Sequence, residues 1–392
     1  MNVPFMEAIT YGVSSMKIVC FMVYTIEVPM RFTVSHMLAE RKVARNILVC
    51  AMGDNDLIGW GESCPRPYVT GETIDTAKKN LLKDILPPMI GSSFSNLCEL
   101  TEALTSMLGG LDRNRQAAFC AAELAILDLA GKTFDTSAGT VIGPIVHRKV
   151  RYSGVIATSN PVKAKKHAQL MRMFGFREIK VKVQQSLDAN LQLLEIMRTI
   201  LGSRISIRID ANCAWQSDEA IRQIDAMSKF KLAGVEQPVP ADDYEGMRQV
   251  TAAKLVPVVA DESLCSLNDA EKLIEQKGCD IFNIRVSKCG GLINSLAIYR
   301  KAIDAGLACQ LGAQVGETAI LSAAGRHIAT RCRAIKWFEG SYGRLLLKRD
   351  IAKPNMTIGL GGWAKSLNRP GLGVEPIQKY INKYKVDLIE MC

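Results

Sequence analysis

The sequence has few of the residues that build metal clusters, disulfide scaffolds or nucleic-acid surfaces. It contains only four histidines, and its 12 cysteines are scattered singly. This pattern argues against a zinc or redox cluster and predicts free thiols in a cytoplasmic protein, because disulfide scaffolds are short and rich in cysteine. Aromatic residues make up 6% of the chain and no basic cluster alternates with them, so the net charge of +10 does not indicate nucleic-acid binding. A small anionic substrate fits this charge.

Long apolar runs are also missing. No run reaches the ~18 residues that a membrane-spanning helix needs, since residues 16–29 are interrupted by Lys17 and Glu27. We therefore expect no membrane partner. Residues 1–15 lack the basic start, apolar core and cleavage site of a secretion signal, and we expect them to form an N-terminal extension. The 392 residues, 48% of them hydrophobic, predict two domains.

The pattern of predicted elements changes near residue 147. Before it, strand-like and helical stretches predict an α+β domain at residues 16–146. After it, eight short apolar strands alternate with helical stretches, which predicts an α/β fold with a closed parallel barrel at residues 147–345, followed by a C-terminal segment, 346–392. The strand-like stretches read YSGVIA, EIKVKV, ISIRIDAN, GVEQP, VPVVADES, IFNIRVS, ACQLGAQ and AIKWFEG.

Charged residues recur at the ends of these predicted strands. Lys182, Asp210, Glu236, Asp261 and Arg285 follow one another at intervals of 28, 26, 25 and 24 residues, and each interval is the length of one βα unit. Because matching positions on adjacent barrel strands lie at one level, the three acidic residues are expected to converge at the mouth. Oxygen ligands without nearby Cys or His favour Mg²⁺. Taken singly, each acidic residue could instead cap a helix or solvate a turn.

Two lysines share one side of a predicted strand. In the stretch REIKVKVQQ, alternation sends Lys180 and Lys182 the same way, while β-branched residues line the other side. These lysines face either solvent or a reactive interior. The acidic residues at matching strand ends favour the reactive interior.

The order of the motifs resembles that of the enolase superfamily, muconate-lactonizing subgroup, over residues 16–376. The resemblance implies a modified (β/α)₇β barrel of the TIM type beneath an N-terminal α+β capping domain, which RPGLGVEP, residues 369–376, returns to complete. It also implies a homo-oligomer. The motifs that carry it are GWGES, PYVTGET, AELAILDLAGK, IKVKV, IDAN, VEQP, ADES and NIRVSKCGG.

The resemblance assigns roles to individual residues. It implies Mg²⁺ ligands, a catalytic lysine base with a lysine partner, and supporting residues at the metal shell or the substrate. It also implies that the segments around Arg31–His36 and after the third strand are loops that close over a substrate, with ordinary surface loops as the alternative for each. The metal ligands are Asp210, Glu236 and Asp261, the base is Lys182 with Lys180 beside it, and the supporting residues are Asn212, Glu262 and Glu339.

Arg285 departs from the motifs of the muconate-lactonizing subgroup, because most members of that subgroup have a second lysine at the matching position of the sixth barrel strand. A guanidinium with a pKa above ~12 is a poor base. We therefore expect one-base chemistry on the enediolate of a small carboxylate substrate, in a cycloisomerase or lyase-type reaction like that of muconate cycloisomerase, with Arg285 as a fixed cation. Lys288, three residues on, should point to the opposite face of the strand and be structural. Epimerisation of a dipeptide or N-acyl amino acid, and non-catalytic carboxylate binding, remain open alternatives.

Overall fold

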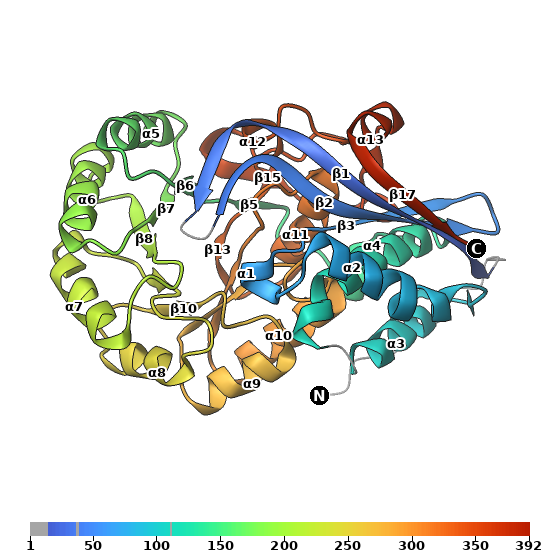
Figure 1. Ribbon diagram of the computed structural model, residues 1–392, viewed down its shortest axis with the longest axis horizontal. Coiled ribbons are helices and arrows are strands. Elements are labelled where there is room, and N and C mark those ends of the chain that lie inside the picture. Colours follow the sequence, from blue (N-terminus) through green and yellow to red (C-terminus); the bar gives the residue numbers. More distant parts are fainter. Residues whose placement is uncertain (1–14, 37–38, 110–111) are drawn as a thin grey trace.

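The computed structural model describes residues 15–36, 39–109 and 112–392. A strand-rich part, drawn mainly in blue, lies beside a second sheet, and helices lie along the outer side of that sheet (Figure 1). All but the last residue of the expected N-terminal extension lie outside the described residues. No helix within the described ranges is long and apolar enough to cross a membrane.

The strand-rich part is the capping domain, and its centre is an antiparallel sheet with the strand order β17-β1-β2-β3, in which β17 (Lys385–Met391) comes from the C-terminal end of the chain. Its meander consists of β1 (Met16–His36), β2 (Ala39–Gly53) and β3 (Ile58–Ser63). The prediction of a loop at Arg31–His36 is wrong, because the backbone of β1 pairs with β2 as far as His36. The two strands form long arms that extend towards the barrel (Figure 1).

Helices cover this sheet. They are α1 (Pro67–Thr70), α2 (Ile74–Asn80), α3 (Leu97–Leu108) and α4 (Gln116–Thr133). Helix α4 lies directly against β3, where a Cβ atom on Gly59 or Gly61 would come within 2.1 Å of Ala125 O or 2.0 Å of Ala121 O. The glycines of GWGES therefore belong to a strand that a buried helix approaches closely.

The second part is the predicted modified barrel. Eight parallel strands lie in the order β6 to β13, and an α-helix follows each strand up to β12, which confirms the expected (β/α)₇β architecture. Ser153, just before β6, donates its N–H to Phe338 O of β13 (2.7 Å) and so joins the first strand to the last. The strands are β6 (Gly154–Ile156), β7 (Glu178–Lys182), β8 (Ser206–Asp210), β9 (Val235–Glu236), β10 (Val258–Ala260), β11 (Ile281–Ile284), β12 (Ala308–Leu311) and β13 (Ile335–Phe338).

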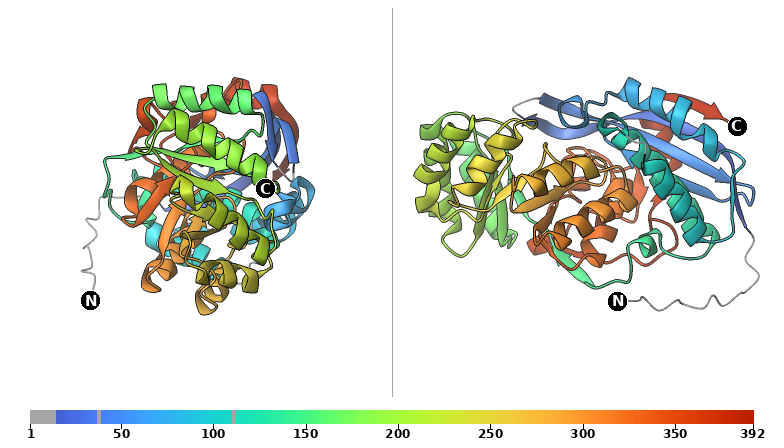
Figure 2. Two further views of the ribbon diagram at one scale, coloured as in Figure 1. Left: turned by 90° about the vertical axis from the view of Figure 1, so that its left-hand side faces the viewer. Right: turned by 90° about the horizontal axis from the view of Figure 1, so that it is seen from below.

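The barrel helices lie on the outside of the sheet, as the view from below shows (Figure 2). Capping side chains fix several helix starts. Ser186, for example, accepts a hydrogen bond from Ala189 N at the beginning of α6. The helices are α5 (Pro161–Met173), α6 (Leu187–Leu201), α7 (Ser217–Met227), α8 (Tyr244–Ala252), α9 (Leu267–Glu275), α10 (Leu292–Asp304) and α11 (Ala319–Arg331).

The C-terminal segment returns to the capping domain. After α12 (Gly343–Leu346) and α13 (Gln378–Tyr384), strand β17 (Lys385–Met391) pairs antiparallel with β1. Phe21 lies opposite Met391, so the next residues in register, Cys20 and Cys392, meet and form a disulfide. The prediction of free thiols is therefore wrong for this pair, although the other ten cysteines are free.

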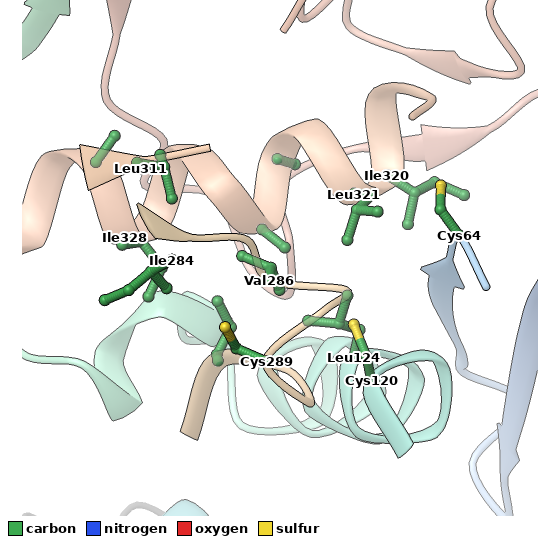
Figure 3. Close-up of a cluster of buried hydrophobic side chains, with 14 of the residues drawn as sticks. Cys64, Cys120, Leu124, Ile284, Val286, Cys289, Leu311, Ile320, Leu321 and Ile328 are labelled. Carbon is green, nitrogen blue, oxygen red and sulfur yellow. The ribbon is translucent and has the colours of Figure 1, made fainter. Parts of the chain in front are cut away.

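One core joins the two parts. Cys120 and Leu124 of α4 pack with Val286 and Cys289 after β11 and with Leu321 of α11 (Figure 3). Two buried carboxylates of the cap strengthen this junction. Glu62 of β3 accepts hydrogen bonds from the N–H groups of Thr318 and Leu321 at the start of α11, and Glu123 of α4 accepts those of Leu292 and Ile293 at the start of α10. The cap is thus held against the barrel by apolar packing and by helix capping.

Candidate active site

Both lysines of β7 face the interior of the barrel. Lys180 is buried, and its Nζ lies 2.9 Å from Glu236 Oε1, 2.8 Å from Glu339 Oε2 and 3.3 Å from Asp210 Oδ2. Burial opposes its charge, but these carboxylates raise the pKa of Lys180 well above its ordinary value. Lys182, at the end of the strand, donates to Asn212 Oδ1 (2.6 Å) and keeps 19% of its side chain exposed. Lys182 is therefore the more accessible of the two amino groups.

The three predicted acidic ligands lie at the ends of adjacent strands. Asp210 and Glu236 are partners in the β8–β9 register, and Asp261 follows β10 directly. All three are fully buried. Burial raises the pKa of Glu236 to about 7, and neighbouring carboxylates add to the rise while Lys180 opposes it. The strand spacing therefore brings the acidic residues together, as expected.

Arg285 lies between two of these carboxylates. Its Nη2 forms an ion pair with Asp261 and lies 3.5 Å from Glu236 Oε1, while Nη1 donates to Gln314 Oε1 at 3.4 Å. Although burial raises the pKa of a carboxyl group, Arg285 and Lys288 lower the pKa of Asp261 below its ordinary value. Arg285, predicted to be a fixed cation, therefore contacts the carboxylates of Asp261 and Glu236.

Lys288 does not point away from the site. Strand β11 ends at Ile284, and the turn that follows brings Lys288 Nζ to 2.9 Å from Asp261 Oδ1, 2.6 Å from Asp261 O and 2.8 Å from Asn283 O. The predicted orientation is wrong, because strand alternation does not continue through a turn. The side chain is fully buried, so its ammonium group is enclosed by these three oxygens.

The expected supporting residues contact this cluster. Asn212 donates from Nδ2 to Glu262 Oε1 (3.1 Å), and thereby links Glu262 to Lys182. Burial and the neighbouring Asp261 raise the pKa of Glu262 to about 8. Glu339 is buried between Lys180 and Arg208. Both carboxyl groups are therefore enclosed by protein groups.

Sequence reasoning missed three polar residues inside the barrel. Arg208 pairs with Glu339 and donates from Nη1 to Ser153 Oγ (3.1 Å). Asn283 Nδ2 and Gln310 Nε2 donate to the two oxygens of Glu236, at 3.1 and 2.8 Å. Each is a polar side chain within an apolar strand, and strand registers pair Lys180 with Arg208 and Asn283 with Gln310. Polar residues at matching strand positions were the signal that could have revealed them.

The carboxylate oxygens of this cluster are suitable ligands for a divalent cation, but in the structure they contact Lys180 and Arg285. Among the described residues, no three acidic, histidine or cysteine side chains are arranged to hold a metal ion. The physical reason is that Lys180 and Arg285 occupy oxygens of Asp210, Glu236 and Asp261. Three buried carboxylates are nevertheless a donor set that suits Mg²⁺.

Comparison with known proteins assigns the family. The model of the family described as "Enolase C-terminal domain-like" matches residues 163–380. The chain belongs to this family. The resemblance to the enolase superfamily is thereby confirmed.

Its relatives include isomerases. The N-succinyl-L-Arg/Lys racemase of Bacillus cereus is 27% identical over 363 residues, 92% of this chain and 95% of the relative. The dipeptide epimerase of Enterococcus faecalis V583, solved with Mg and the dipeptide L-Leu-L-Tyr, is 26% identical, has a TM-score of 0.83, and aligns over 92% of this chain and 100% of its own. The muconate lactonizing enzyme of Pseudomonas fluorescens, with a TM-score of 0.86 over 94% of this chain and 99% of its own, is 22% identical and shows the fold alone. The expectation of a muconate cycloisomerase-like reaction is therefore not supported.

Proposed function

We propose that this protein is a Mg²⁺-dependent isomerase that removes and returns the proton α to the carboxylate of a dipeptide or an N-acylated amino acid. The observation that carries the proposal is the position of Lys182, partly exposed beside three fully buried carboxylates. The named activities of the racemase and epimerase relatives support this substrate class over a muconate.

Each residue of the cluster has a role in this proposal. Asp210, Glu236 and Asp261 would hold Mg²⁺, which supplies positive charge where the substrate carboxylate gains electron density. Lys182 takes the α-proton, because it is the accessible amino group. Lys180, surrounded by carboxylates, stays charged and balances them.

Return of the proton to the opposite face needs a second donor. The Lys288 ammonium group is enclosed by Asp261 and Asn283, so Arg285 is the remaining candidate for this second proton donor. Because arginine seldom gives up its proton, its presence favours a second candidate, a one-base elimination or cycloisomerisation of the same kind of carboxylate.

Proton exchange in D₂O distinguishes the two candidates. ¹H NMR would follow the α-proton of each stereoisomer, namely the two enantiomers of N-succinyl-lysine and the two epimers of L-Ala-Glu at the glutamate α-carbon, with Mg²⁺ and then with EDTA. The isomerase predicts deuterium incorporation and interconversion for both epimers of one substrate, and EDTA should stop both. Exchange of a single epimer without interconversion would favour one-base chemistry. Absence of exchange in every dipeptide and acyl amino acid, from protein that binds Mg²⁺, would refute the proposal.

A further inference from the structure

A cavity of about 260 Å³ lies in the capping domain, outside the cluster of lysines and carboxylates. Its walls come from β2, from the segment between β3 and α2, and from the first residues of α2. Three arginines line it, Arg41, Arg45 and Arg66, together with a single acidic residue, Asp75. We call it the arginine pocket.

Two of the arginines have no acidic partner. Arg66 is 4% exposed, and it donates only to neutral oxygens, namely the carbonyls of Arg45, Pro65 and Val315 and the side chain of Asn46. Its Nε is buried without a hydrogen-bond partner, as is Nη1 of Arg41. Within the part of the chain that the structure describes, neither guanidinium forms an ion pair with a carboxylate. Arg66 is buried and Arg41 is partly buried, and a guanidinium removed from water without a counter-charge among the described residues favours an anionic ligand.

The other charges around the pocket do not neutralise it. Arg45 pairs with Glu27 at 3.3 Å, but both side chains are largely exposed. The Arg41 guanidinium lies 5.3 Å from the centre of the Tyr68 ring, so its flat face is held by an aromatic ring. Burial and the charge of Arg66 lower the pKa of Arg41. A bound anion would relieve this repulsion.

The arginine pocket adjoins the mouth of the barrel. Arg66 Nη2 donates to Val315 O (2.9 Å), and the preceding residue, Gln314, accepts a hydrogen bond from Arg285. Both residues belong to the loop that follows β12. Asn46 holds the same loop by donating to Gly316 O (2.9 Å). A single loop therefore separates the arginine pocket from the cation that contacts Asp261 and Glu236.

We infer that the arginine pocket binds a second carboxylate of the substrate, so that the substrate is a dicarboxylate whose acyl or side-chain arm ends in –COO⁻. This inference rests on the proposed function, because that function places the first carboxylate and its α-proton beside Lys182. A guanidinium can donate two parallel N–H groups to one carboxylate, and three residues that carry this group, Arg41, Arg45 and Arg66, line the cavity. The cavity also has room for methylene groups next to the carboxylate.

Matched substrates test the inference. N-succinyl-lysine and N-butanoyl-lysine have acyl arms of equal length, but only the succinyl arm ends in a carboxylate. α-Proton exchange should have a kcat/KM at least tenfold higher for the succinyl compound. Arg41→Met should reduce this ratio at least tenfold, mainly through the KM of the succinyl compound, whereas Arg248→Met, at an exposed pair on α8, should leave it unchanged. Equal kcat/KM values for the two compounds in active protein would overturn the inference.

A binding measurement separates this inference from the proposed function. Calorimetry with N-succinyl-lysine on the Lys182→Ala protein needs no turnover, and adding Arg41→Met or Arg66→Lys to that protein should weaken binding at least tenfold. If the unaltered protein catalyses no α-proton exchange but the arginine variants still weaken binding of N-succinyl-lysine, the carboxylate-binding pocket is supported and the proposed reaction is refuted. Unchanged binding in both arginine variants would remove the pocket. Calorimetry with inorganic phosphate gives a further outcome. If phosphate binds more tightly than N-succinyl-lysine and Arg41→Met abolishes that binding, the pocket is a phosphate site and the inferred dicarboxylate class is overturned.

Discussion

The buried side chain of His327 should make stability depend on pH. It is fully buried in α11, and its Nε2 lies 3.1 Å from Leu372 O in the C-terminal segment. Nδ1 is buried without a hydrogen-bond partner among the described residues. Burial, with help from the charges of Arg331 and Arg326, lowers the pKa of His327 to about 3. The folded protein therefore keeps this imidazole neutral where an unfolded chain would protonate it.

The sign and size of the effect follow from proton linkage. Because the folded pKa is lowered, the stabilising contribution is complete above the unfolded pKa of ~6.5 and is lost progressively as the pH falls towards 3. A pH of 5 is ~1.5 units below the pKa of histidine in the unfolded chain, and each unit changes the free energy of unfolding by ~1.36 kcal/mol. The free energy of unfolding should therefore lose about 2 kcal/mol through this side chain between pH 7.5 and pH 5.

Buried carboxyl groups act in the opposite direction, so a variant has to isolate the histidine. Burial raises the pKa of Glu62 to about 7 and those of Glu123 and Glu317 to about 8, and these groups favour the folded state as the pH falls. Replacing His327 by Gln keeps an N–H donor for Leu372 O but removes the titration. Urea unfolding of both proteins at pH 7.5 and 5 should show the unaltered protein losing about 2 kcal/mol more than the variant. Equal losses would refute the buried, neutral imidazole.

Three further predictions concern the candidate active site. Asp261→Asn should leave a folded protein that has lost Mg²⁺ affinity in calorimetry, because one of three balancing charges is gone; unchanged binding would contradict the ligand assignment. Lys182→Ala should lower turnover ~10²- to 10⁴-fold at unchanged Mg²⁺ affinity, and a loss below tenfold would exclude Lys182 as the base. Arg285→Lys should accelerate deuterium exchange in the epimer that the unaltered protein handles more slowly. If ¹H NMR finds the same ratio of exchange rates, residue 285 is not a proton donor.

The barrel can be predicted from the sequence because it is built from local patterns. Each βα unit has its own apolar strand and amphipathic helix, so the unit spacing by itself places Asp210, Glu236 and Asp261 at neighbouring strand ends. The shared orientation of Lys180 and Lys182 follows from strand alternation alone. These inferences need only the period of the side chains and the length of the repeating unit.

The features that sequence reasoning missed depend on contacts between distant segments. The Cys20–Cys392 disulfide requires the register of β17 on β1, which no local pattern contains. Lys288 returns to Asp261 through a turn, where strand alternation no longer applies. The carboxylates of Glu62 and Glu123 cap helices of the other domain, so their function becomes visible only when the two domains are docked.

The disulfide also changes the connectivity of the chain as a covalent object. With Cys20 joined to Cys392, the backbone of residues 20–392 and the disulfide bond form a closed covalent ring. A protease that cuts one peptide bond within the ring opens it without releasing a fragment, because the disulfide keeps the two pieces covalently joined until a reductant is added. The same closure means that new chain ends could be placed in an exposed barrel loop while the original end stays fastened to β1.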